Sequence, residues 1–252
     1  MARSAPLRAL LLAAVAGGVA LLLLATGQEA RAVVAADCVA GQWYDGTECV
    51  TVDVGFYTDE SGATEQLAIP LGSEGTGGAE DGTGSTGTAL CAAGTYRGAA
   101  DTTFCVDAEA GSVVAAEGAT APTLCEAGTF QAETGQTTCE DAPAGSFVAA
   151  AGATAATLCE AGSFSAAAGA SACTPAAVGF FVASAGATSQ TAIPLGSEGT
   201  GGASDGTGST GTDECEAGSY RGDADTTSCV DAAVGFFVAS AGATSQTAIP
   251  LG

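Results

Sequence analysis

The 252-residue chain contains no lysine, no histidine and no asparagine. The first two absences exclude reactions that need an imidazole base, a lysine Schiff base or a phosphate-binding lysine. Without asparagine there is no acceptor for N-linked glycosylation. Basic residues are scarce as well: five arginines face 28 acidic residues, for a formal charge of −23. Because phosphate contacts need clustered arginine and lysine, a nucleic-acid partner is not expected.

The start of the chain has the features of a secretory signal peptide. Arg3 and Arg8 form a positively charged region before an apolar stretch that runs uninterrupted over residues 9–25, and residues 30–32 (Ala-Arg-Ala) have the small-x-small pattern of a cleavage site. We therefore predict a signal peptide over residues 1–32 and a secreted or cell-surface protein. The alternative is an uncleaved signal anchor, although the apolar run is shorter than the roughly 20 residues that usually span a bilayer.

Large apolar residues are few once this leader is set aside. Residues 33–252 contain two arginines and 27 carboxylates, and valine, leucine, isoleucine and phenylalanine make up only 34 of 220 residues. Such a low apolar content with a high net charge is typical of disordered chains. Hydrophobic burial alone is therefore not expected to fold this region.

A 17-residue repeat argues against disorder. Glycines recur at this spacing from Gly94 to Gly179 and from Gly218 to Gly235. Most units have a second glycine seven residues later and an aromatic residue or valine just after the first, which predicts a short strand, a glycine turn and a return strand. One such hairpin cannot bury its single aromatic residue, so neighbouring hairpins are expected to stack. The predicted fold is a small disulfide-rich, mainly β or irregular structure, an elongated array of hairpin-like repeats with little regular helix outside the signal peptide.

The ten cysteines are in step with this repeat. The pattern Cys-x-x-Gly-x-aromatic occurs five times, and each copy is closed by a second cysteine. Ten cysteines alone do not define a connectivity, but the short pairs keep their spacing on either side of the longer gaps. We therefore predict five disulfides: Cys38 with Cys49, Cys91 with Cys105, Cys125 with Cys139, Cys159 with Cys173, and Cys215 with Cys229. A redox or zinc role is not expected, because the chain has no histidine and no Cys-x-x-Cys motif.

The run from Cys125 to Cys139, followed by Ala-Gly-Ser-Phe at residues 144–147, resembles the ephrin-receptor-like cysteine-rich repeats of the growth-factor-receptor cysteine-rich superfamily. It is most similar to the degenerate versions in large exported bacterial and protist proteins, and the resemblance extends over residues 38–252. It implies a disulfide-stapled spacer, scaffold or protein-binding ectodomain without catalysis, and it supplies no catalytic residue. Family members commonly have a further cysteine three residues after the closing one, where this chain has Val52, Ala108, Ala142, Ala176 and Ala232.

Two near-identical segments interrupt the cysteine repeats. Residues 73–88 and 197–212 are rich in glycine, serine and threonine, a composition that predicts flexible loops or linkers. Carboxylates within them could bind calcium, since hard cations take oxygen ligands; the candidates are Glu74, Glu80, Asp81 and Asp205. The regular carboxylate spacing of known calcium loops is absent, so a solvated loop is the favoured interpretation and no other cofactor is expected.

The resulting plan has seven segments. They are a signal peptide (1–32), a shortened cysteine module (33–54), a repeat unit (55–72), an insert (73–90), a cysteine-rich array (91–196), a second insert (197–214), and a cysteine module with a final repeat (215–252). Because residues 232–252 repeat residues 176–196 identically, we expect either a truncated gene model or a chain cut from a longer array.

Two further motifs are weaker. Arg221-Gly222-Asp223 spells the tripeptide that integrins bind, whereas the alternative is that Arg221 neutralises Asp223 or Asp225 locally. The paired phenylalanines at 180–181 and 236–237 suggest a self-association face.

Two function classes follow from these observations. The favoured one is a non-enzymatic structural spacer, adhesion or matrix component that contacts protein partners or itself. The alternative is a receptor-like or calcium-binding extracellular module. Membrane contact is expected only through an uncleaved signal anchor or a missing C-terminal region.

Overall fold

The computed structural model describes residues 32–99, 104–223 and 228–250. In these ranges the regular structure consists of short two-stranded antiparallel hairpins and one 3-10 turn, η1 (Ala35–Asp37). The predicted fold class, a small disulfide-rich array of hairpins with little helix, is confirmed. The predicted signal peptide lies outside the described residues except for its last residue.

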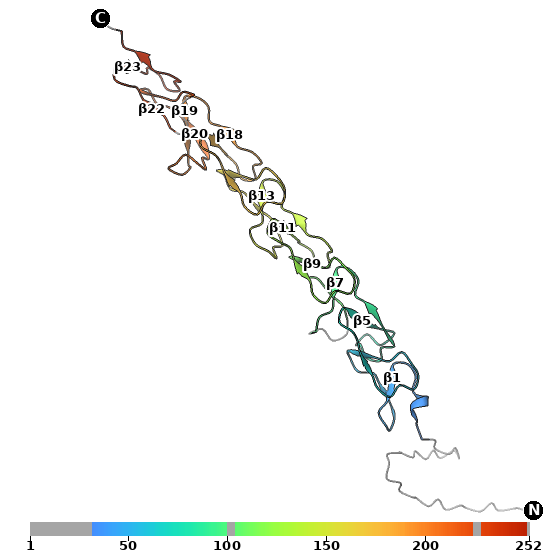
Figure 1. The fold of residues 1–252 in the computed structure, drawn as a ribbon. Helices are drawn as coiled ribbons and strands as arrows, with labels where there is room; N and C mark the ends of the chain where they lie inside the picture. Colours follow the sequence, from blue (N-terminus) through green and yellow to red (C-terminus); the bar gives the residue numbers. More distant parts are fainter. Residues whose placement is uncertain (1–31, 100–103, 224–227, 251–252) are drawn as a thin grey trace, which may run out of the picture. The chain divides into compact units, whose positions relative to one another are not determined.

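The chain divides into two units, the first of which comprises the residues up to Cys91 together with Arg97–Cys105. Its described part forms three hairpins (Figure 1): β1 (Gln42–Tyr44) with β2 (Cys49–Thr51), β3 (Phe56–Tyr57) with β4 (Leu67–Ala68), and β5 (Ser73–Thr76) with β6 (Gly87–Leu90).

The second unit comprises Ala92–Tyr96 and Val106–Gly252. Its described part forms nine hairpins, which follow one another along this unit in sequence order (Figure 1). They are β7 (Thr95–Tyr96) with β8 (Val106–Asp107), β9 (Ser112–Val113) with β10 (Thr123–Leu124), β11 (Thr129–Phe130) with β12 (Glu140–Asp141), β13 (Ser146–Phe147) with β14 (Thr157–Leu158), β15 (Ser163–Phe164) with β16 (Thr174–Pro175), β17 (Phe180–Phe181) with β18 (Thr191–Ala192), β19 (Ser197–Thr200) with β20 (Gly211–Glu214), β21 (Ser219–Tyr220) with β22 (Val230–Asp231), and β23 (Phe236–Phe237) with β24 (Thr247–Ala248).

The glycine that opens each hairpin has a positive φ, and in several hairpins it also leaves room for a neighbouring segment. Gly128, for example, has a φ of 93°, a conformation that side-chain-bearing residues rarely adopt. A methyl group added at Gly128 would collide with the carbonyl of Gly169, two hairpins further along. The N–H of Gly128 donates to the carbonyl of Val148 in the next hairpin at 2.8 Å. The 17-residue spacing is therefore the spacing of contacts between successive hairpins.

The core has one principal position in each hairpin, three residues before the opening glycine. Cysteine holds it in the disulfide modules, and alanine, valine or isoleucine holds it in the others. In the last hairpin Ala232 is half-buried there, and in the others the side chain is almost completely buried: Cys38, Val52, Ile69, Cys91, Ala108, Cys125, Ala142, Cys159, Ala176, Ile193 and Cys215. Alanine at 108, 142 and 176 thus fills a core site.

A second buried position lies three residues after the opening glycine. The cysteine-free hairpins β9–β10, β13–β14, β17–β18 and β23–β24 place valine there, as at Val148 and Val182, whereas the cysteine modules from β7–β8 onward place a polar residue there, as at Gln131 and Arg221. The hairpin β3–β4 has Thr58 at this position, and β5–β6 and β19–β20 have glycine. The backbone at this position joins neighbouring hairpins, because the Val148 N–H donates to the Ala170 carbonyl at 3.0 Å. Side-chain burial and backbone pairing thus meet at the same place in each repeat.

The prediction that residues 73–90 and 197–214 are flexible inserts is wrong. They form the hairpins β5–β6 and β19–β20, each with four paired residues per strand. Their glycines serve close packing: a methyl group at Gly199 would lie 2.5 Å from Ser209 Oγ and 2.8 Å from Ile193 Cδ1. Each hairpin is a lengthened member of the repeat and is not an interruption of it.

Candidate functional site

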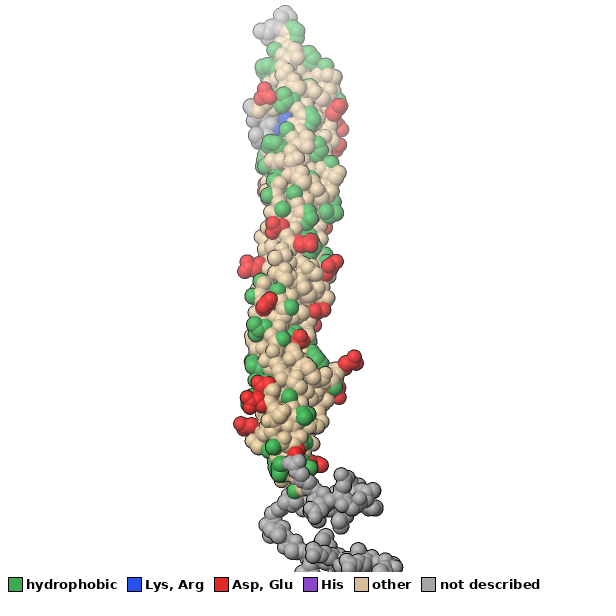
Figure 2. Space-filling view, turned by 90° about the vertical axis from the view of Figure 1, so that its right-hand side faces the viewer, with side chains coloured by type: hydrophobic (Ala, Val, Ile, Leu, Met, Phe, Trp, Pro, Cys, Tyr) green, Lys and Arg blue, Asp and Glu red, His purple; other side chains and the backbone are tan. Residues whose placement is uncertain are grey.

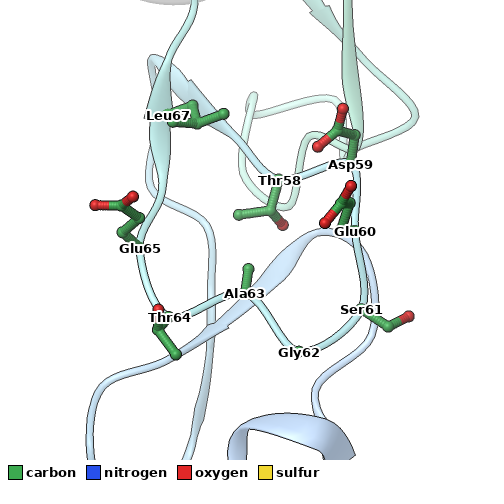
Figure 3. A pocket seen from close by; sticks show the side chains of 9 residues that line it. All are labelled: Thr58, Asp59, Glu60, Ser61, Gly62, Ala63, Thr64, Glu65 and Leu67. Atoms are coloured by element: carbon green, nitrogen blue, oxygen red, sulfur yellow. The ribbon is translucent and has the colours of Figure 1, made fainter.

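One hollow, of about 460 Å³, opens on the first unit. It is formed by the loop between β3 and β4, from Thr58 to Leu67. Figure 3 shows the carboxylates of Asp59 and Glu60 on one side of the hollow and that of Glu65 on the other. Three carboxylates thus line the hollow.

The acidic lining of this hollow was missed by the sequence analysis. The equivalent turn in β17–β18 has Ala183, Ser184 and Ser189 in place of the three carboxylates. A comparison of these sister turns, Thr-Asp-Glu-Ser-Gly-Ala-Thr-Glu against Val-Ala-Ser-Ala-Gly-Ala-Thr-Ser, was the signal that could have revealed it.

The calcium candidates have local structural roles. Asp81 Oδ1 accepts hydrogen bonds from the Thr83 N–H at 3.0 Å and from the Thr83 hydroxyl at 2.7 Å, and Asp205 makes the same two bonds with Thr207. These bonds stabilise the charged carboxylate and lower the pKa of both aspartates. The Thr83 backbone N–H has the largest effect on the pKa of Asp81, and the Thr207 hydroxyl has the largest effect on that of Asp205. Each aspartate therefore orders its own turn.

Glu74 also has a partner within the protein, because its carboxylate accepts a hydrogen bond from the Cys105 N–H at 3.4 Å. Glu198, the equivalent residue in the second lengthened hairpin, accepts one from the Cys229 N–H at 3.1 Å. Glu80 is exposed. In the described ranges, no three acidic or cysteine side chains gather in a metal-binding cluster. Calcium binding at these residues stays a prediction.

The arginine of the Arg221-Gly222-Asp223 tripeptide is buried. Its side chain is 4% exposed, and its Nη1 donates to the carbonyls of Ile193 at 3.3 Å, Pro194 at 3.1 Å and Ser197 at 3.1 Å. Asp223 is exposed, no ion pair joins it to Arg221 in the described structure, and Asp225 lies outside the described residues. The prediction of local neutralisation by Asp223 is therefore wrong. Integrin-type recognition stays a prediction, and it requires the arginine to leave these carbonyls.

Arg97 occupies the same place in the first unit. Its Nη1 donates to the carbonyls of Ile69 at 3.2 Å and Pro70 at 3.1 Å. Both arginines thus bind the Ile-Pro segment that precedes a lengthened hairpin. We infer that they hold that segment in place rather than meet a partner.

The two phenylalanine pairs differ in exposure. Phe180 and Phe181 are half-buried, whereas Phe236 and Phe237 are exposed. Figure 2 shows that, on the face in view, acidic side chains are dispersed among polar and hydrophobic groups.

Five disulfides form within the modules, at the pairs that the cysteine spacing predicts: Cys38–Cys49, Cys91–Cys105, Cys125–Cys139, Cys159–Cys173 and Cys215–Cys229. No cysteine is left free in the described part of the chain. Every cysteine thus has a structural role.

Residues 111–159 match the family model described as tyrosine-protein kinase ephrin type A/B receptor-like. The match includes the Cys125–Cys139 module with the cysteine-free hairpins on either side of it. This segment is an ephrin-receptor-like cysteine-rich repeat. The same hairpin geometry and short disulfides recur in the modules outside the match. No curated protein matched the chain in a sequence comparison.

The matched family is a non-enzymatic, receptor-like one, and the match over residues 111–159 indicates an extracellular binding module. The interaction that this class supports is with protein. Within the described ranges the structure contains no helix of the length and apolarity needed to cross a bilayer.

Proposed function

We propose that the protein is a secreted or cell-surface spacer, an extracellular scaffold whose stacked repeats keep the two ends of the array a fixed distance apart. The observation that carries this proposal is the repeated backbone contact between successive hairpins. Gly128, Gly145 and Gly162 each donate an N–H to the next hairpin, at 2.8, 2.9 and 2.8 Å. Each added repeat therefore extends the same ladder without changing the others.

The composition of the repeats supports the same proposal. Each hairpin buries little more than one core residue and one neighbour, so its stability depends on stacking and on the disulfides. On the face shown in Figure 2 the acidic side chains are dispersed, an arrangement that favours solubility over tight binding at any one place. The receptor-like alternative requires a localised protein-binding surface.

Deleting residues 142–175 tests the spacer role. The deletion removes two 17-residue repeats with the complete Cys159–Cys173 disulfide, and it joins Asp141 to Ala176, which occupies the same core position as Ala142. For a spacer, the maximum dimension from small-angle X-ray scattering should fall in proportion to the residues removed. An unchanged maximum dimension in a correctly disulfide-bonded variant would contradict the proposal.

A further inference from the structure

The tripeptide Asp-Gly-Thr occurs three times in the chain, each time in the turn of a hairpin. It lies at residues 45–47 between β1 and β2, at residues 81–83 between β5 and β6, and at residues 205–207 between β19 and β20. The glycine has a positive φ in all three turns, of 104°, 82° and 83° in chain order. Because the three segments have the same sequence, a difference in their chemistry reflects the fold around them.

Asp-Gly is a sequence in which the backbone readily reacts with the aspartate side chain, because glycine has no side chain to hinder the attack. The glycine nitrogen loses its proton and bonds to the carboxyl carbon Cγ of the aspartic acid, whose hydroxyl leaves with that proton as water. The product is a cyclic succinimide. Water then opens the ring. When it breaks the bond between the glycine nitrogen and the original backbone carbonyl carbon, the chain continues through the side chain as isoaspartate.

The three carboxyl groups are held alike. Oδ1 of each aspartate accepts hydrogen bonds from the N–H of the threonine two residues later and from its hydroxyl, the latter at 2.7 Å in every case. Asp45 also accepts from the Glu48 N–H at 2.9 Å, which has the largest effect in lowering the pKa of Asp45. These bonds favour the ionised carboxylate and so slow ring closure at all three sites. Because Asp45 is exposed, water competes for the additional bond, and its effect on the rate is small.

The three glycine nitrogens, by contrast, differ in their surroundings. Gly82 is buried, and its N–H donates to the Ala79 carbonyl at 2.9 Å. Gly206 is half-buried, and its N–H donates to the Ala203 carbonyl at 2.9 Å. Gly46 is exposed, and a methyl group added there would meet no atom within 4 Å. Among the described residues no group accepts a hydrogen bond from the Gly46 N–H. The attacking nitrogen is therefore accessible in the first turn and hydrogen-bonded in the other two.

We propose that Asp45 is a site of spontaneous covalent modification in the folded protein, at which the Asp45–Gly46 linkage rearranges through a succinimide to isoaspartate. The fold protects Asp81 and Asp205 from the same reaction. The first turn has room for the added backbone carbon, since nothing lies against Gly46, and the Cys38–Cys49 disulfide anchors the strand that follows. This modification does not depend on the proposed spacer role.

The test incubates the full oxidised chain at neutral pH and follows each site over time. After reduction, chymotryptic peptides separate the three sites, and electron-transfer fragmentation distinguishes isoaspartate from aspartate. Isoaspartate should accumulate about tenfold faster at Asp45 than at Asp81 or Asp205, where a backbone hydrogen bond must open first. An unincubated sample gives the background. The variant Asp45→Glu should form no such product at position 45, because its ring would be larger and closes far more slowly.

The reduced and alkylated chain in guanidinium chloride is the matched control, since it keeps the three tripeptides and removes the fold. The three sites should then react at similar rates. Equal rates in the folded chain would overturn the proposal, as would the absence of isoaspartate at Asp45 in the folded chain. A faster reaction at Asp45 that persists in the unfolded chain would also overturn it, because the flanking sequence and not the fold would then set the rates.

Discussion

At the scale of the residue, a few charged side chains are not simply solvated. They form hydrogen bonds to backbone groups of the chain. Arg221 reaches three carbonyls, Glu198 accepts from a cysteine N–H, and Asp205 accepts from the backbone and hydroxyl of Thr207. Charged groups bound to backbone in this way order loops that have little apolar surface of their own.

Replacement of Arg221 by methionine should destabilise the second unit, because it leaves the carbonyls of Ile193, Pro194 and Ser197 without this donor. The expected loss is roughly 2 kcal/mol of unfolding free energy, measured by urea denaturation. Asp223→Ala is the control, because this exposed carboxylate is expected to matter by less than about 0.5 kcal/mol. Equal effects of the two substitutions would contradict the structural role of the arginine.

The pKa of Asp205 offers a second check. Its hydrogen bonds exist in the folded state and lower the pKa, so their stabilising effect is present above the unfolded value and is lost as the pH falls through the folded one. Below about pH 4 the β19–β20 turn should therefore loosen. Thr207→Val removes the hydroxyl and should raise the pKa of Asp205 towards the ordinary value, as measured by carboxyl 13C NMR. An unchanged pKa would show that the turn does not form as described.

At the scale of the element, the hairpin is specified by glycines with two different uses. Some occupy backbone conformations with positive φ, and others leave room for a neighbouring segment of the same chain. Gly199 and Gly211 both lie in β19–β20 and neither has a positive φ. Substitutions at these two positions therefore test close packing without the effect of a positive φ.

Gly199→Ala should therefore destabilise the hairpin more than Gly211→Ala. A methyl group at Gly199 meets Ser209 Oγ at 2.5 Å and Ile193 Cδ1 at 2.8 Å, whereas one at Gly211 meets only Thr200 Oγ1 at 3.1 Å. Overpacking of this kind typically costs about 1–3 kcal/mol. Amide hydrogen exchange at Val182, whose N–H donates to the Ser209 carbonyl, measures the difference in hairpin stability between the two variants. Similar exchange rates in the two variants would argue against close packing at Gly199.

Glycine spacing and cysteine spacing predicted the hairpins and the five disulfides, because both patterns reflect contacts that recur at a fixed distance along the chain. The lengthened hairpins were predicted as flexible because composition cannot distinguish a glycine that is free to move from one packed on Ile193. The burial of Arg221 depends on carbonyls 24 to 28 residues earlier in the chain, which no local pattern reveals.

At the scale of the whole molecule, stability depends on crosslinks more than on apolar burial. The principal core position holds cysteine in five hairpins and alanine in several others. Each disulfide closes a short loop, and the four with a sequence separation of 14 should contribute about 3 kcal/mol each.

Reduction and alkylation of the cysteines should therefore unfold the chain at neutral pH and room temperature. The remaining apolar residues are too few to compensate, and the repulsion among the carboxylates favours expansion. Circular dichroism and the radius of gyration would report the change, with the oxidised chain under the same conditions as the control. A reduced chain that keeps its β signal and its size would show that stacking alone maintains the fold.

The burial of the arginines has a consequence for proteolysis. Beyond residue 32 the chain has no lysine, and its two arginines, Arg97 and Arg221, are about 5% and 4% exposed. Proteases that cleave after basic residues must bind that side chain in a pocket, which buried arginines do not allow. We expect the folded chain beyond residue 32 to resist trypsin and the unfolded chain to be cut after both arginines. Reduction then separates three fragments, because the disulfides Cys91–Cys105 and Cys215–Cys229 span the two cut bonds. Tryptic cleavage would therefore measure how often the hairpin stack opens.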